Sequence, residues 1–78
     1  MADDGVFSVI EVVCKVGGIQ TLEPDQDFYD AGFTSVMALP LLMEMEERFQ
    51  VSIPDERFVK ARTARALREI INSLQEGS

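Results

Sequence analysis

Ser35 carries the hydroxyl that is best placed for chemistry in this sequence. It lies in the segment DAGFTSVMALPL, residues 30–41, at the start of an apolar run with helical spacing. A serine nucleophile of the hydrolase kind needs a general base, and the sequence contains no histidine. A chain of 78 residues is also too short to enclose a substrate. We therefore expect no catalysis by Ser35 on its own.

The position of Ser35 fits two interpretations. In the first turn of a helix, its hydroxyl would lie beside backbone N–H groups without acceptors, at the positive end of the helix dipole. That environment stabilises an attached phosphate, so Ser35 is suited to carry one. Serine is also among the commonest N-cap residues, and on position alone a cap is the simpler interpretation. Other motifs have to decide between the two.

The acids and the single cysteine of this sequence do not match a known metal site. Four acids gather in one segment: Glu23, Asp25, Asp27 and Asp30. Their spacing excludes an EF-hand, because the glycine and the bidentate glutamate of that loop are missing. Two interpretations of these acids remain, a solvated acidic loop and a weak cation site. Because the ligand pattern of a metal site is missing, we favour the solvated loop. Cys14 lies in an apolar run, so we interpret it as a small core residue without chemistry.

Length, composition and charge limit the class of protein. The 78 residues correspond to one domain, residues 1–78, and an apolar fraction of 46% predicts a packed core. A net charge of −7 repels nucleic acid and anionic lipid and attracts basic protein surfaces. The start of the chain lacks signal-peptide features, and no apolar run is long enough to span a bilayer. With a lone cysteine that suits a reducing compartment, we expect a soluble, cytoplasmic monomer.

Two elements are expected before Ser35. Apolar residues at helical spacing predict helix one over about residues 5–16, after the candidate caps Asp3 and Asp4. These apolar positions are Val6, Val9, Ile10, Val13 and Val16. Their valines also favour a strand, which the spacing only partly rejects. Residues 17–34 predict a long loop that apolar side chains anchor to the core. The anchors are Leu22, Phe28 and Phe33.

The strongest helical pattern, helix two, covers about residues 35–50. Its apolar positions return at steps of three and four residues: Val36, Leu39, Leu42, Met43, Met45 and Phe49. Its polar side holds Glu44, Glu46, Glu47 and Arg48. Pro40 interrupts the pattern, because a proline beyond the first turn removes a backbone hydrogen bond. We expect a kink or a loosened first turn there.

Two shorter patterns complete the predicted fold. Pro54 suits the first position of helix three, about residues 55–60, and Thr63 can cap helix four, about residues 63–75. The apolar stripe of helix four consists of Leu67, Ile70, Ile71 and Leu74. Four helices with connected apolar faces predict an all-α fold. We expect a small antiparallel four-helix bundle with three main helices and a short third one.

The order of several motifs resembles the acyl carrier protein family. The matching features follow one another without a gap: Asp27-Phe28, Asp30, Gly32, Ser35 with a hydrophobic residue after it, Met43, Glu46-Glu47, Phe49 and Ile53-Pro54-Asp55. The resemblance implies a four-helix carrier whose Ser35 receives 4'-phosphopantetheine from coenzyme A, attached by a separate magnesium-dependent transferase. The carrier would not be an enzyme, and the thiol of its arm would hold an acyl or aminoacyl group as a thioester. Activation of the hydroxyl by the transferase would explain the absence of histidine.

The resemblance also implies where partners dock. Thr34 and Val36 flank the attachment serine. The family presents its second helix to partner enzymes, and the matching positions here are Val36, Met37, Pro40, Met43, Glu44, Glu46 and Glu47, followed by Asp55. The implied partners are the phosphopantetheinyl transferase, an acyl- or aminoacyl-loading ligase or transferase, and downstream synthase enzymes with basic docking patches. Such contacts are expected to be small and salt-sensitive.

Some positions depart from the family pattern. Thr34-Ser35-Val36 replaces the usual Asp-Ser-Leu, and Ala31-Gly32 replaces the glycine pair of peptidyl carriers. Thr34 can still cap helix two through its hydroxyl. Pro40 replaces a polar residue of the docking face, which favours a specialised partner such as a dedicated ligase in secondary metabolism. The segment FQVSIPD resembles acyl carriers more than peptidyl ones.

We therefore interpret the chain as a discrete acyl carrier protein of a polyketide, fatty-acyl or other secondary-metabolite pathway. Met1 and the polar tail favour a free-standing protein. One alternative is an aminoacyl or peptidyl carrier of a nonribosomal-peptide type of pathway. The other is an unmodified helical adaptor that binds a protein through its acidic helix.

Overall fold

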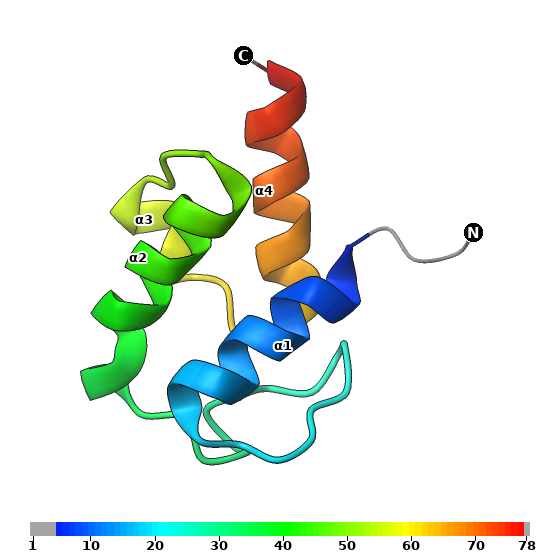
Figure 1. Ribbon diagram of the computed structural model, residues 1–78, viewed down its shortest axis with the longest axis vertical. Helices are drawn as coiled ribbons and strands as arrows, with labels where there is room; N and C mark the ends of the chain where they lie inside the picture. The colour runs from blue at the N-terminus through cyan, green and yellow to red at the C-terminus, as the bar shows by residue number, and fades with distance from the viewer. Residues whose placement is uncertain (1–4, 78) are drawn as a thin grey trace.

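The computed structural model describes residues 5–77. In chain order, its helices are α1 (Val6–Gly17), the 3-10 helix η1 (Ser35–Met37), α2 (Ala38–Phe49), α3 (Asp55–Phe58) and α4 (Ala64–Gly77). α1 packs against both α2 and α4, and α3 packs against α4 (Figure 1). The prediction of a small all-α bundle is confirmed. The candidate caps Asp3 and Asp4 lie outside the described residues, within which no helix is both long and apolar enough to cross a bilayer.

α1 forms where the sequence allowed both a helix and a strand. As a helix, the segment buries one valine-rich face that consists of Val6, Val9, Val12 and Val13. Burial of this face outweighs the modest preference of valine for strands. The helix ends at Gly18, whose left-handed backbone (φ 68°) suits glycine and lets its N–H donate to the carbonyl of Cys14.

The long loop between α1 and η1 is anchored to the core by the predicted apolar side chains. Leu22, Phe28 and Phe33 are all buried. The rings of Phe28 and Phe33 meet edge to face, with their centroids 5.1 Å apart. Gly17 lies so close to this pair that a Cβ there would come within 2.7 Å of the Phe33 ring. The last turn of α1 therefore packs against the end of the loop that leads to Ser35.

Pro40 lies in the first turn of α2, where a helix has no intrahelical acceptor for a backbone N–H. The residues before α2, Ser35–Met37, form a 3-10 turn instead of an α-helical start. The predicted loosened first turn is confirmed in this form. The α-helical part begins at Ala38 and not at residue 35.

The buried face of α2 differs from the predicted one. Leu41, Leu42 and Met45 are buried, whereas Val36, Leu39 and Met43 are exposed. The assignment of Leu39 to the core was wrong, whereas Val36 and Met43 are also among the expected docking residues. Residues 36–45 are almost all apolar, so their spacing allows more than one buried stripe. The packing of α2 against α1 decides between the stripes.

α3 and α4 complete the core. Pro54 has an extended backbone (φ −61°, ψ 135°) and is the N-cap residue of α3, so the expectation that it takes the first helical position was wrong. Phe58 is buried and holds the single turn of α3 to the core. Thr63 caps α4 as predicted, because its Oγ1 accepts a hydrogen bond of 3.1 Å from the N–H of Ala66. α4 then buries Ala64, Leu67 and Ile71.

Candidate functional site

Ser35 lies where the long loop turns into a helix, and it is exposed. Thr34 before it is extended (φ −117°, ψ 161°), and the N–H of Met37 donates to the Thr34 carbonyl at 3.0 Å. The N–H of Ala38 donates to the Ser35 carbonyl, so η1 continues directly into α2. The Ser35 hydroxyl therefore lies at the N-terminus of one helical run, residues 35–49. At such a position the helix dipole and N–H groups without intrahelical acceptors favour an anion.

Thr34 is exposed beside Ser35, but its side chain does not cap the helix. The prediction of a Thr34 cap was wrong, and the 3-10 geometry gives the reason. A capping hydroxyl would bond to the N–H two or three residues further on. The Met37 N–H already donates to the backbone carbonyl of Thr34 in the tighter 3-10 pattern. The helix start is thus left without a side-chain cap.

The surface around Ser35 is apolar. The exposed fractions are 84% for Val36, 63% for Leu39, 61% for Met43 and 65% for Val59. A shallow pocket of about 190 Å³ lies between α2 and α3, lined by Ala38, Leu39, Leu42, Asp55, Phe58 and Val59. Asp55 is the one titratable residue of that lining, so the pocket does not resemble a catalytic centre. Sequence reasoning had assigned Leu39 to the core and had no signal for Val59 beyond its apolar character.

The remaining predicted docking residues differ in accessibility. Pro40 and Asp55 are exposed, on α2 and at the start of α3. Met37 is partly buried and packs against the core, so it offers a partner less of its side chain than Met43 does. Val36, which follows Ser35 directly, and Met43 of α2 are both exposed. Most of the predicted apolar docking residues are therefore accessible on the helical run that Ser35 begins.

The three carboxylates of α2 have different surroundings. Glu44 Oε2 lies 3.5 Å from Lys15 Nζ of α1. Glu46 Oε2 accepts a hydrogen bond of 2.9 Å from the N–H of Ile53, in the link to α3. Glu47 is exposed, and no side chain of residues 5–77 forms an ion pair with it. Of the three, Glu47 is the most available to a partner, and Glu46 has a structural role that sequence reasoning missed.

The acidic loop before Ser35 forms ion pairs with the arginines at the start of α4. Asp25 Oδ1 and Asp27 Oδ2 each lie 2.7 Å from an arginine Nε, of Arg65 and Arg62 respectively. The Arg62 hydrogen bond, together with the backbone N–H groups of Tyr29 and Asp30, holds the pKa of Asp27 below its usual range. Across residues 5–77, no group of three His, Cys, Asp or Glu side chains is arranged to hold a metal ion.

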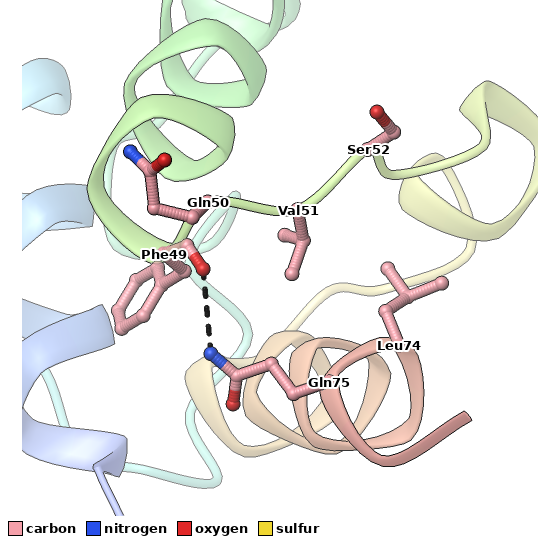
Figure 2. Close-up of a pocket in the computed structure, with 6 residues that line it drawn as sticks. All are labelled: Phe49, Gln50, Val51, Ser52, Leu74 and Gln75. Carbon is pink, nitrogen blue, oxygen red and sulfur yellow. Dashed lines mark hydrogen bonds between the residues drawn. The ribbon is translucent and has the colours of Figure 1, made fainter. Parts of the chain in front are cut away.

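Two further features lie away from Ser35. A depression of about 630 Å³ is at the opposite end of α2 and is lined by Phe49, Gln50, Val51, Ser52, Leu74 and Gln75 (Figure 2). There Gln75 Nε2 donates to the Phe49 carbonyl at 3.3 Å. Cys14 is partly buried on α1, and burial raises the pKa of its thiol, which suits a core residue. Neither feature takes part in the helix start.

Comparison with known proteins identifies the family. A family model described as a phosphopantetheine attachment site matches residues 8–71. This chain belongs to the acyl carrier protein family. No curated protein sequence matches this carrier.

Among solved structures, the carrier is similar to a hexanoyl acyl carrier protein from the actinorhodin polyketide synthase of Streptomyces coelicolor, described as a non-natural intermediate. The TM-score is 0.71, and the sequences are 26% identical. The match covers 100% of this chain and 93% of that chain. The helical arrangement of Figure 1 is therefore that of an acyl carrier protein.

The cofactor of this family, and so of this carrier, is covalently bound 4'-phosphopantetheine. Carriers of this kind are generally not enzymes, and they work with phosphopantetheinyl transferases and synthase enzymes. The helix start fits the attached group, because it combines an exposed hydroxyl with N–H groups that no side chain caps.

Proposed function

We propose that Ser35 is the residue that bears the 4'-phosphopantetheine of this carrier. Ser8 and Ser73 lie inside α1 and α4, and Ser52 lies in the link before α3. Ser52 and Ser73 are exposed as well, but of these four serines only Ser35 begins a helix. This observation supports the proposal, since an attached phosphate would meet the backbone N–H groups and the helix dipole there.

Attachment of the cofactor needs groups from both the carrier and its transferase. The surface around Ser35 offers an accessible oxygen on a defined helix start but no histidine or other evident base. The Ser35 oxygen would bond to the phosphorus of coenzyme A that bears the pantetheine, the pyrophosphate bond would break, and adenosine 3',5'-bisphosphate would leave. The Ser35 proton would pass to a group of the transferase, which activates the hydroxyl from outside. When bound, the cofactor supplies a terminal thiol that holds an acyl group as a thioester.

The partner enzymes would dock on the surface that surrounds Ser35. Its centre is apolar and consists of Val36, Leu39, Met43 and Val59. Glu47 and Asp55 supply negative charge at its edges, while Glu44 and Glu46 contribute less because they have internal partners. Thr34, Met37 and Pro40 border this surface. A complementary enzyme surface would combine an apolar patch with nearby Arg or Lys, in a small and salt-sensitive interface that releases the carrier after each step.

We propose an acyl cargo and a polyketide or fatty-acyl type of pathway, in which this chain acts as a cytoplasmic carrier. The similarity to the actinorhodin carrier supports the acyl side. An aminoacyl cargo is the alternative. Mass spectrometry of the group bound to protein purified from its native host distinguishes the two.

Intact mass after coexpression with a broad-specificity phosphopantetheinyl transferase tests the attachment site. The wild-type chain should gain one phosphopantetheine increment, and Ser35→Ala should abolish it. Ser52→Ala is the matched control, because Ser52 is also exposed but lies in a link instead of at a helix start, so this variant should be modified fully. An increment that survives in Ser35→Ala contradicts the proposed site. A wild-type chain that is never modified would favour the adaptor.

A further inference from the structure

The loop before η1 is tied to the start of α4 by a group of contacts around one ion pair. Arg62 Nε donates to Asp27 Oδ2 at 2.7 Å, and the guanidinium carbon lies 4.6 Å from the centroid of the Tyr29 ring. The backbone takes part too: the Phe28 N–H donates to the Arg62 carbonyl at 2.9 Å, and Asp27 forms an isolated antiparallel bridge with Thr63. We call these contacts the Asp27–Arg62 clasp.

The second carboxylate oxygen of Asp27 orders the chain that follows. Asp27 Oδ1 accepts from the N–H groups of Tyr29 at 2.8 Å and Asp30 at 3.4 Å, which starts a tight turn. The Phe28 carbonyl then accepts from the N–H of Phe33 at 3.0 Å, and the two rings pack edge to face. Phe33 is followed by Thr34 and Ser35. A continuous series of contacts therefore runs from the clasp to the helix start.

We propose that Arg62 is a positioning residue for the modification of Ser35. By holding Asp27, it defines the turn of residues 27–33 and thus the point at which η1 begins. The inference rests on the proposed attachment at Ser35. Its physical reason is that transfer to a hydroxyl depends steeply on geometry, since a displacement of about 1 Å is enough to slow a reaction by about 100-fold.

A positioning role differs from a general contribution to stability. The side chains of Arg62 and Asp27 are 56% and 28% exposed, and ion pairs that solvent reaches add little to global stability. The buried rings of Phe28 and Phe33 would keep the loop on the core without the pair. Loss of Arg62 should therefore leave the domain folded while the helix start becomes less well defined.

The chain offers a matched control for this distinction. Asp25 and Arg65 join the same loop to α4 at the same distance, 2.7 Å. Asp25 precedes the turn, and its carboxylate does not accept from Tyr29 or Asp30, whose N–H groups bond to Asp27. Asp25→Asn therefore removes an ion pair of the same length and should leave the turn before Ser35 unchanged.

Steady-state kinetics of arm transfer from coenzyme A by a broad-specificity transferase test the role of Arg62. In Arg62→Gln, kcat should fall about tenfold because the hydroxyl is misplaced. The KM for the carrier should stay the same, since the docking surface on α2 and α3 is intact. Arg62→Lys keeps the charge and should restore most of kcat, and Asp25→Asn should match the wild type.

Amide hydrogen exchange gives a readout that does not depend on the transferase. Arg62→Gln should speed exchange at the N–H groups of Phe33 and Met37, which close the turn and η1. Asp25→Asn should not change exchange at Met37. A wild-type kcat in Arg62→Gln, an equal loss in Asp25→Asn, or a raised KM with kcat retained would each overturn the proposal. If the wild-type chain is not modified at all, the proposed function fails, and exchange at Met37 alone still decides whether the clasp defines the helix start.

Discussion

The N-terminal end of α2 is open to solvent, whereas its C-terminal end is held by hydrogen bonds to other segments of the chain. At the N-terminal end, the helix start has no side-chain cap, and Val36, Leu39 and Met43 are exposed. At the C-terminal end, two hydrogen bonds tie the helix to other segments, from the Ile53 N–H to Glu46 and from Gln75 Nε2 to the Phe49 carbonyl. A small domain makes few contacts in total. When hydrogen bonds within the domain hold one end of a helix, the other end can stay open to partner enzymes while the helix remains intact.

This division also explains why the open end departs from ordinary folding rules. Exposed valine, leucine and methionine add nothing to the core, and an uncapped helix start forgoes a favourable hydrogen bond. Such departures are expected at functional sites, where binding a partner compensates for them. The stabilised end of α2, together with the buried stripe of Leu41, Leu42 and Met45, supports the open end.

The largest expected effect comes from two methionines of α2 that differ in burial. Met45 is fully buried and Met43 is 61% exposed. Met45→Ala should lower the free energy of unfolding by about 2–5 kcal/mol, because it leaves a cavity in the core. Met43→Ala should change it by less than about 0.5 kcal/mol. Chemical denaturation measures both. Equal losses would mean that the assignment of the buried face is wrong.

A smaller effect should separate two neighbouring carboxylates. Glu46→Ala removes the acceptor of the Ile53 N–H and should cost about 1–2 kcal/mol of unfolding free energy, because that partly buried donor is left without a partner. Glu47→Ala should be nearly neutral for stability, since Glu47 is exposed. The same denaturation series checks both variants. A neutral Glu46→Ala would show that the C-terminal end of α2 does not depend on this bond.

The smallest expected effect concerns pH. The pKa of Asp27 is lowered in the folded state, first by its hydrogen bond to Arg62, so its stabilising contribution is present above the ordinary aspartate pKa of about 4. That contribution should disappear as the pH falls through the lowered pKa. The difference in unfolding free energy between wild type and Asp27→Asn should therefore shrink in acid. A difference that does not change between pH 6 and pH 2 would contradict the assigned shift.

Local rules predicted much of the fold. The helical spacing of valines in α1, the aromatic anchors of the loop and the Thr63 cap all depend on residues close in sequence, and the structure confirms each of them. The unusual start of α2 was also foreseen, because a proline affects its own helix wherever that helix lies. Ser35 at the beginning of this helix needed no knowledge of distant residues either.

Other features depended on residues far apart in the sequence. The apolar run of residues 36–45 fits more than one buried stripe, and contact with α1 selects among them. The Thr34 cap failed because a 3-10 turn replaced the α-helical start. Each ion pair of the acidic loop joins two residues that are far apart in the sequence, by 35 positions in one pair and by 40 in the other. Helical and strand periodicity relates only residues that are close in sequence, so it could not predict these pairs.

By itself, the sequence determined the helical class of this carrier and the order of its motifs, and it placed an unactivated serine at a helix start, because these properties follow from neighbouring residues. Only the tertiary structure decided which face of α2 is buried, which carboxylates stay available to partners and how the loop before Ser35 is held. The physical reason is that burial and pairing are properties of contacts between separate segments, and a one-dimensional pattern does not contain those contacts.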